Sequence, residues 1–160
     1  MSKPLAYLIS WTTYGTWLQG DERGWVESGT PGIRPPDPIR KEDAAERMTD
    51  AIVVLSSQQR HLVEDTIRKH CEIRRWQLHA VNARTNHVHV VATADVAPEV
   101  VMSQLKAWCS RQLSEQAGLV AAQEGNRNGL KKWWTQHGST KWINDQQYLH
   151  NAIKYVLERQ

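Results

Sequence analysis

The sequence predicts an α+β protein with a ferredoxin-like sandwich, in which helices cover one face of an antiparallel sheet and leave the other face open. Three observations lead to this prediction. Segments typical of strands and helices follow in the order strand, helix, strand, strand, helix, strand, and an additional helix ends the chain. The strand segments alternate in polarity, whereas the helical segments repeat apolar residues every three or four positions. A length of 160 residues suits one hydrophobic core, so we expect a single domain over residues 1–160.

The first element is predicted to be a strand over Leu5–Gly15, because this stretch contains β-branched and aromatic residues and ends at a glycine. Residues 20–50 follow it and are rich in proline and glycine, with no sustained hydrophobic period. This composition predicts a long surface loop, and loops of that length are often functional.

The next segments predict a helix followed by two strands. The stretch Ser56–Trp76 begins with a serine suited to cap a helix. Its apolar residues recur at helical spacing and are Leu62, Val63, Ile67 and Cys71. The stretches Trp76–Thr85 and Asn86–Ala94 then alternate as two strands joined by a short polar turn.

The second half of the chain predicts two more helices with a strand between them. The stretch Ala97–Gly118 is expected to be a helix that ends near its glycine. The residues on one face of this helix are Met102, Leu105, Cys109 and Leu113. The stretch Lys132–Trp142 reads as a last strand or a short hairpin, and Asn144–Gln160 as a terminal helix. The apolar face of that helix consists of Leu149, Ile153 and Val156.

Composition narrows the environment of the protein without fixing its function. A formal net charge of +3 and a pI of about 9.0 fit a polyanionic partner but do not require one. Cys71 and Cys109 lack CxxC spacing and fall in helical segments, so we expect buried free thiols in a reducing cytoplasm. The stretch LAYLISW is too short for a signal peptide or a membrane span, and we therefore expect a cytoplasmic protein with no membrane contact.

Two histidines in the stretch TNHVHVVATA carry the strongest chemical signal. With a strand period of two, His87 and His89 point to one side of the sheet, while Val88 and Val90 point to the other and can be buried under the helices. The histidines would lie about 6.5 to 7 Å apart at their Cα atoms, a separation that two imidazoles can close around one divalent cation. Ordinary half-exposed strand histidines remain an alternative interpretation.

The stretch NHVHVV resembles the histidine-hydrophobe-histidine motif of HUH endonucleases. Together with a helix, a tryptophan-rich segment and the terminal IKYVLERQ, it is similar to single-tyrosine transposases of bacterial insertion sequences and their REP-associated relatives. The resemblance extends from AYLISWTTYGTWLQGDERGW to the last residue. It implies a ferredoxin-like palm, a Mg or Mn ion held by His87 and His89, and cleavage of single-stranded DNA through a 5′-phosphotyrosine. The expected partner is single-stranded DNA with hairpin ends, and the protein could be a homodimer.

Two tyrosines on the terminal helix could supply the nucleophile. A phenol is suited to this chemistry because phenolate both attacks phosphorus and leaves again, so that a strand can be rejoined. Tyr148 and Tyr155 are seven residues apart and share a helix face, so spacing does not separate them, but the resemblance selects Tyr155. The family's third metal ligand is a glutamine one turn later. Here Gln160 is at i+5, on the apolar side, whereas Glu158 at i+3 shares the face of Tyr155, and both remain candidates.

Basic and aromatic residues are the candidate DNA contacts. In the segment from residue 131 to residue 142, lysines flank tryptophans, a combination of basic and aromatic residues that single-strand binding needs. A solvated turn beside core tryptophans would have the same composition. His137 precedes small residues that allow backbone amides to approach a phosphate. The full set of DNA-contacting candidates is His137, Lys131, Lys132, Lys141, Trp133, Trp142, Arg34 and Arg75.

Three functions therefore compete at the level of sequence. The leading hypothesis is a metal-dependent transposase that cleaves and rejoins single-stranded DNA. The second is a domesticated DNA hairpin-binding protein that keeps the fold and has lost the chemistry. The third is an unrelated metal-dependent hydrolase built around His87 and His89, in which Tyr155 has no role.

Overall fold

The computed structural model describes residues 3–15, 52–118 and 132–158. The predicted loop over residues 20–50 lies outside the described residues. The same holds for three candidate site residues, Arg34, Lys131 and Gln160.

Four strands form one sheet in the order β2-β3-β1-β4, and each neighbouring pair is antiparallel. This order, with helices after the first and third strands, confirms the predicted ferredoxin-like fold. In chain order the elements are β1 (Ala6–Thr12), α2 (Ser57–Arg74), β2 (Gln77–Ala83), β3 (His87–Thr93), α3 (Pro98–Gln116), β4 (Ser139–Ile143) and α5 (Gln146–Glu158). No helix in the described ranges is long and apolar enough to cross a membrane.

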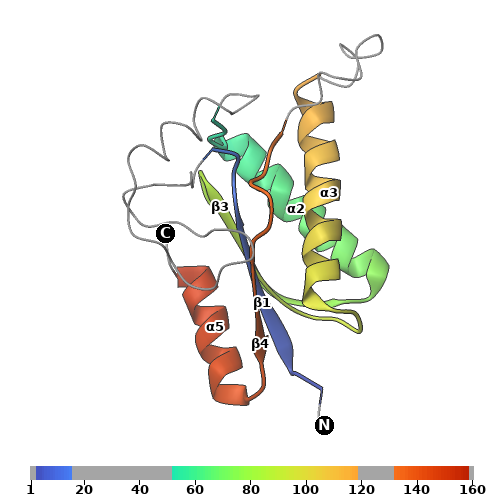
Figure 1. Ribbon diagram of the computed structural model, residues 1–160, viewed down its shortest axis with the longest axis vertical. Helices are drawn as coiled ribbons and strands as arrows, with labels where there is room; N and C mark the ends of the chain where they lie inside the picture. Colours follow the sequence, from blue (N-terminus) through green and yellow to red (C-terminus); the bar gives the residue numbers. More distant parts are fainter. Residues whose placement is uncertain (1–2, 16–51, 119–131, 159–160) are drawn as a thin grey trace.

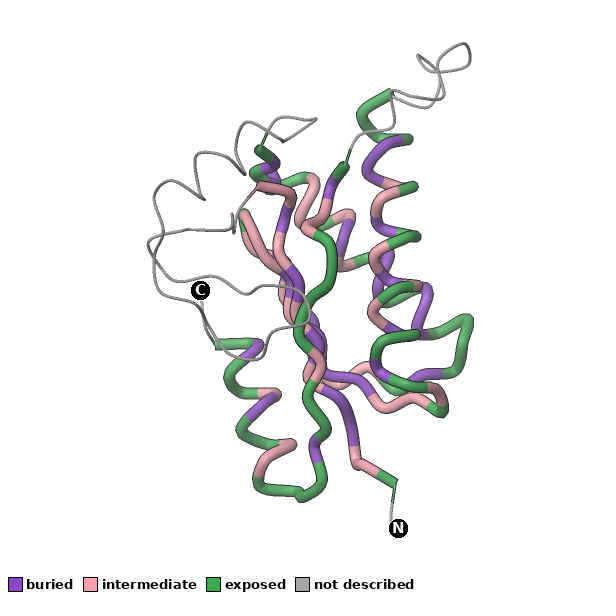
Figure 2. The backbone as a smooth tube through the Cα atoms, in the orientation of Figure 1, coloured by how far each residue is buried: buried purple, intermediate pink, exposed green. Residues whose placement is uncertain are grey.

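Helices α2 and α3 pack side by side on one face of the sheet (Figure 1). The main core lies between them and the strands, and Figure 2 shows that buried residues concentrate along the strands. As the alternation predicted, Val88 and Val90 belong to this core. Its fully buried large side chains include Ile9, Trp11, Val63, Ile67, Leu105 and Leu113.

The opposite face is not open, because α5 packs on it, mainly against β2 and β3. A smaller core forms there, and its buried members are Ala6, Ala80, Val91, Ile143, Ala152 and Val156. The expectation of an uncovered second face was therefore wrong for this half of the sheet. The physical reason is that an amphipathic terminal helix buries its apolar stripe, and the β2–β3 half of the sheet offers an apolar surface for it.

The start of the first long helix follows the predicted signal. Ser56 caps α2, with its hydroxyl accepting from the Gln59 backbone N–H while the Gln59 side chain accepts from the Ser56 N–H. Arg75 ends the helix in the left-handed conformation, with φ of 62°. The chain then turns directly into β2.

The two cysteines face each other's helices within the main core. Cys71 on α2 and Cys109 on α3 are buried free thiols, which confirms the expectation from the sequence. Burial raises the pKa of Cys71 to about 11, and burial, with a smaller effect of Cys71, raises the pKa of Cys109 as well. Both side chains therefore stay protonated and act as apolar core residues.

Candidate metal and nucleophile site

The two motif histidines lie on the face of the sheet that α5 covers, as predicted from their alternation with Val88 and Val90. His87 and His89 are half-buried on β3, and their ring centroids are 4.7 Å apart with the planes tilted by 70°. Because alternate side chains of β3 point to the same face, the two imidazoles lie next to each other on one surface. This arrangement can provide two nitrogen ligands to one divalent cation.

A row of polar side chains crosses the sheet at the level of His89. The strand register places Ser10 on β1 and Asn82 on β2 on either side of it. The Ser10 Oγ lies 2.6 Å from the His89 Nδ1. The Asn82 Nδ2 donates to the Val156 carbonyl oxygen at 2.8 Å and so ties α5 to the sheet beside the histidines.

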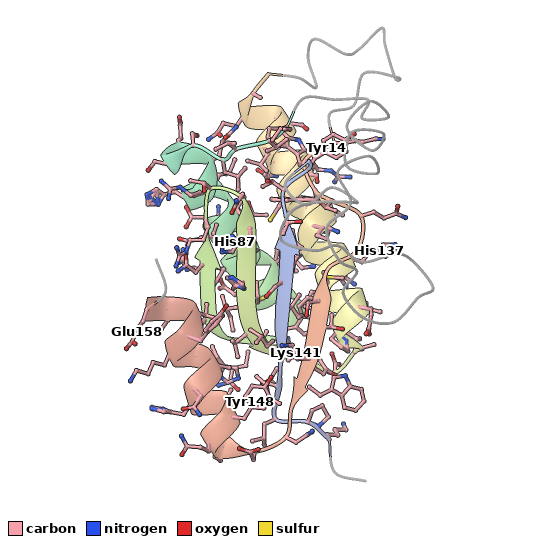
Figure 3. All side chains as sticks on the ribbon, turned by 60° about the vertical axis from the view of Figure 1, so that its left-hand side comes forward. Tyr14, His87, His137, Lys141, Tyr148 and Glu158 are labelled. Atoms are coloured by element: carbon pink, nitrogen blue, oxygen red, sulfur yellow. The ribbon has the colours of Figure 1, made fainter. Side chains whose placement is uncertain are left out.

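The ring of Tyr155 reaches this row from α5. Its centroid lies 5.6 Å from that of His89, with the planes nearly perpendicular, and 40% of the residue is exposed to solvent. Tyr148 lies two turns earlier, about 10 Å along the helix axis, and packs against the smaller core. Figure 3 shows it well away from His87. The structure therefore separates the two tyrosines, which spacing in the sequence could not do.

The described residues include two neighbouring imidazoles that could ligate a metal, but no histidine, cysteine or carboxylate beside them that could serve as a third ligand. Within the described ranges, no group of three His, Cys, Asp or Glu side chains is arranged to hold a metal ion. Glu158 is the last residue of α5, is exposed, and points away from the sheet (Figure 3). Gln160, the other candidate, lies outside the described residues.

The environment of His87 favours the neutral ring. Burial lowers the pKa of His87, and the charge of Arg84 lowers it further. The neutral imidazole is the form that binds a metal, because protonation removes the lone pair. The site thus presents His87 in a ligating form at neutral pH.

One candidate DNA contact, Lys141, lies on the β4 side of the same face, and another, His137, lies before β4 at that edge of the sheet. Lys141 is exposed and pairs with Leu8, whose side chain packs against the smaller core, so Lys141 points to the side of the sheet that holds His89. His137 is exposed at the start of the turn into β4 and has a left-handed backbone with φ of 71°. Figure 3 shows both residues along this edge.

A lysine of α3 holds the turn that contains His137. The Lys106 ammonium donates to the carbonyl oxygens of Thr135 and His137, each at 2.9 Å. A Cβ at the following residue, Gly138, would come within 2.6 Å of the Ser10 carbonyl oxygen and of the Met102 sulfur. Only glycine therefore fits between the strand and the helix at this point.

The remaining candidates lie elsewhere. Trp133 is 2% exposed, and its indole N–H donates to the Ser114 Oγ at 2.9 Å, so we remove it from the DNA-contacting set as a core residue. Trp142 is 57% exposed but lies on the α2–α3 side of β4, with its ring 6.4 Å from that of Tyr7. The ammonium of Lys132 lies 5.7 Å from the ring of Tyr14.

Arg75 is distant from the histidines along the sheet. It precedes β2, whose first residue Gln77 pairs with Thr93 at the end of β3, whereas His87 begins β3. The sequence also missed three polar residues that line the site. Asn86, next to the motif, could have been noticed, but Ser10 and Asn82 are adjacent to His89 only through strand register.

The chain is similar to proteins of known family and fold. The family model of IS200-like transposases matches residues 51–158. The solved structure of a REP-associated tyrosine transposase bound to a REP hairpin aligns with a TM-score of 0.54 and 12% identity, over 97% of this chain and 66% of that chain. A protein of Deinococcus radiodurans that was assigned as a transposase aligns with a TM-score of 0.45 and 14% identity, over 95% of this chain and 93% of that chain. No curated protein matches the sequence.

Proposed function

Because the chain belongs to the family of IS200-like transposases, we propose that it cuts and rejoins single-stranded DNA with Tyr155 as the nucleophile. One observation carries this proposal. The Tyr155 ring lies 5.6 Å from that of His89, which in turn lies 4.7 Å from that of His87. A nucleophile and two potential metal ligands from distant parts of the sequence thus meet on one surface, and residues 1–160 would act as one catalytic domain.

The side chains present fit a divalent cation, Mg or Mn. His87 and His89 offer two neighbouring imidazoles on a half-buried surface. The third ligand would be Gln160, or Glu158 once its side chain turns from the outward direction of Figure 3 towards the histidines. When bound, the ion supplies Lewis-acid stabilisation to the scissile phosphate. Among the described residues, α5 packs mainly against β2 and β3 and meets β4 only at Ile143, the end of that strand away from the histidines, so the β4 side of the histidine row is suited to a DNA backbone.

In this reaction a phosphotyrosine bond replaces the phosphodiester bond that is cut, so the strand can be rejoined without another energy source. The Tyr155 hydroxyl loses its proton, its oxygen bonds to phosphorus, and the bond from phosphorus to the 3′ oxygen breaks, with that oxygen taking up a proton. The cut strand then has a free 3′-hydroxyl, and its 5′ phosphate is attached to Tyr155. In rejoining, a 3′-hydroxyl attacks the same phosphorus and releases the tyrosine phenol.

The β4 side of the histidine face is suited to hold the single strand. Lys141 offers a cation on this face, and the exposed His137–Gly138 turn lies at the same edge of the sheet (Figure 3). Phosphate contacts of this kind position a strand without reading its sequence. We propose that the substrate carries hairpin ends, and the similarity to a hairpin-bound transposase of the same fold supports this choice.

The test is covalent trapping with labelled single-stranded DNA and Mg or Mn. Tyr155→Phe keeps the aromatic ring and removes the nucleophilic hydroxyl, so the protein–DNA adduct should disappear and cleavage should fall by several orders of magnitude. Tyr148→Phe, on the same helix face but away from the histidines, is the matched control and should retain the adduct. DNA binding, measured by gel shift, should survive in both variants.

Each other outcome points to a different function. If Tyr148→Phe is inactive and Tyr155→Phe is active, the nucleophile is misassigned. Cleavage that survives in both variants would indicate a metal-bound water as the nucleophile and would replace the transposase with a hydrolase. A wild-type protein that binds hairpin DNA but forms no adduct would be a binding protein that has lost its chemistry.

A further inference from the structure

Both site histidines are held through the same ring nitrogen. The His87 Nδ1 lies 2.7 Å from the Asn86 Oδ1, and the His89 Nδ1 lies 2.6 Å from the Ser10 Oγ. A neutral imidazole carries one N–H and one lone pair, on different nitrogens. The hydrogen bond made by Nδ1 therefore decides whether Nε2 carries a proton or can bind a metal.

For His87 the hydrogen-bond partner determines which ring nitrogen carries the proton. A side-chain amide oxygen only accepts hydrogen bonds, so the His87 Nδ1 must donate its N–H to the Asn86 Oδ1, and the lone pair is then on Nε2. Asn86 is itself anchored, because its carbonyl oxygen accepts from the backbone N–H of the buried Thr13 at 2.9 Å. The backbone that carries this acceptor is thus held where the β2–β3 turn meets the end of β1.

For His89 the partner is a hydroxyl, which can donate or accept. Ser10 is the cross-strand neighbour of His89, so the sheet register places its Oγ against Nδ1. With Nδ1 occupied in this way, His89 would reach an ion shared with His87 through Nε2. That nitrogen carries a lone pair only if Nδ1 donates to Ser10.

A third histidine on this sheet shows the opposite arrangement. The Thr93 hydroxyl donates to the Leu5 carbonyl oxygen at 2.5 Å, so its oxygen can only accept from His79, whose Nε2 lies 2.8 Å away. His79 is therefore protonated on Nε2. His79 on β2 and His87 on β3 are thus held in different tautomers by the residues around them, and His79 serves as an internal reference.

We propose that Asn86 and Ser10 are positioning residues that hold His87 and His89 in the Nδ1–H tautomer, so that both present Nε2 to one divalent cation. The metal part of this inference rests on the proposed function. The tautomers themselves are a property of the protein without metal or DNA. Partners of this kind commonly change metal affinity by about 10- to 100-fold when they are removed.

The test is nitrogen NMR of metal-free protein labelled with ¹⁵N-histidine, at a pH where the rings are neutral. The sequence has seven histidines, which single His→Gln substitutions would assign. We expect His87 and His89 to be protonated on Nδ1 and His79 on Nε2. A wild-type spectrum with either motif histidine protonated on Nε2 overturns the proposal, whatever the variants do.

Variants then connect the tautomer to the metal. Asn86→Leu and Ser10→Ala should shift His87 and His89, respectively, towards Nε2–H and weaken Mn²⁺ binding about 10- to 100-fold, measured by electron paramagnetic resonance. Asn86→Asp and Ser10→Thr keep an acceptor and should restore the Nδ1–H tautomer. Asn151→Leu on the exposed side of α5 and Ser139→Ala, opposite Ser10 on β4, are the matched controls.

The outcomes separate this proposal from the proposed function. Unchanged tautomers or unchanged Mn²⁺ affinity in Asn86→Leu and Ser10→Ala would overturn the positioning role. Absence of a Tyr155 adduct in the wild-type protein would overturn the strand-cleaving function, while the tautomers and the Mn²⁺ affinities would still support the roles of Asn86 and Ser10.

Discussion

Histidine lies on both sides of this sheet, in two different environments. In the α2–α3 layer, His70 is buried, its Nε2 is 2.8 Å from the Gln104 Oε1, and its ring packs edge-on against Trp76 at 5.4 Å. On the α5 side, His87 and His89 are half-buried and adjacent to each other. His70 is thus enclosed by its partners, whereas His87 and His89 lie next to each other at a half-buried surface.

The difference follows from how much apolar surface each face buries. Two long helices cover one face and enclose a core with several large, fully buried side chains. One short helix covers part of the other, and only small or β-branched residues are fully enclosed there. The face under α2 and α3 therefore contributes most of the stability. The face under α5 can carry polar residues, although burying them lowers stability.

The largest effect should come from truncating a leucine on each side of the sheet. Leu105→Ala on α3 removes a fully buried side chain from the main core and should lower the free energy of unfolding by about 2 to 5 kcal/mol. Leu149→Ala on α5 removes a partly buried one and should cost about 1 kcal/mol. Urea denaturation measures both. Equal losses would mean that the two faces contribute equally to stability and would contradict the difference between them.

A smaller effect is expected at the enclosed histidine. Gln104→Leu removes the acceptor for the buried His70 N–H and should cost about 1 to 3 kcal/mol in thermal or urea unfolding. Gln116→Leu, at the end of the same helix and exposed, is the control and should change little. If both variants are equally stable, the polar pair in the helical layer has no structural role.

The smallest effect is a pH dependence on the α5 side. Burial lowers the pKa of His79 below its usual 6.5, so the unfolded chain binds its proton first as the pH falls. Its contribution to stability is therefore fully present above pH 6.5 and is lost as the pH falls through the lower folded-state pKa. His79→Gln should weaken the drop in unfolding free energy between pH 7.5 and 5.5, and His150→Gln, exposed on α5, should not. An unchanged pH profile in His79→Gln would contradict this assignment.

Most of the fold could be predicted from periodicity, because strand alternation and helical spacing report directly on burial. The strand with the histidines and the helix that begins after Ser56 were found within a few residues of their ends. The segment before β4 was harder, since it contains one isolated bridge at Trp134 and a left-handed His137 before the strand begins at Ser139. The position of α5 depends on which sheet surface is left uncovered, and no local pattern contains that information.

The candidate site was predictable in part, because strand alternation also reports on which side of the sheet a residue lies. Alternation placed His87 and His89 on one side, and resemblance to a family selected Tyr155. Ser10 was beyond reach, because its proximity to His89 depends on the pairing of β1 with β3, and a slip of one residue would turn it to the other face. Composition also could not distinguish the core residue Trp133 from the exposed Trp142, since the two have the same side chain in similar sequence surroundings.

The two protonated, enclosed thiols make this chain convenient for site-specific labelling. Cys71 and Cys109 are the only cysteines of the sequence, and neither presents a thiolate to reagents while the protein is folded. A single cysteine introduced at an exposed position of α5, such as Asn151, would therefore be modified selectively by a maleimide dye without replacement of the native cysteines. A fluorophore at that position would report on movements of α5 in an otherwise unaltered protein.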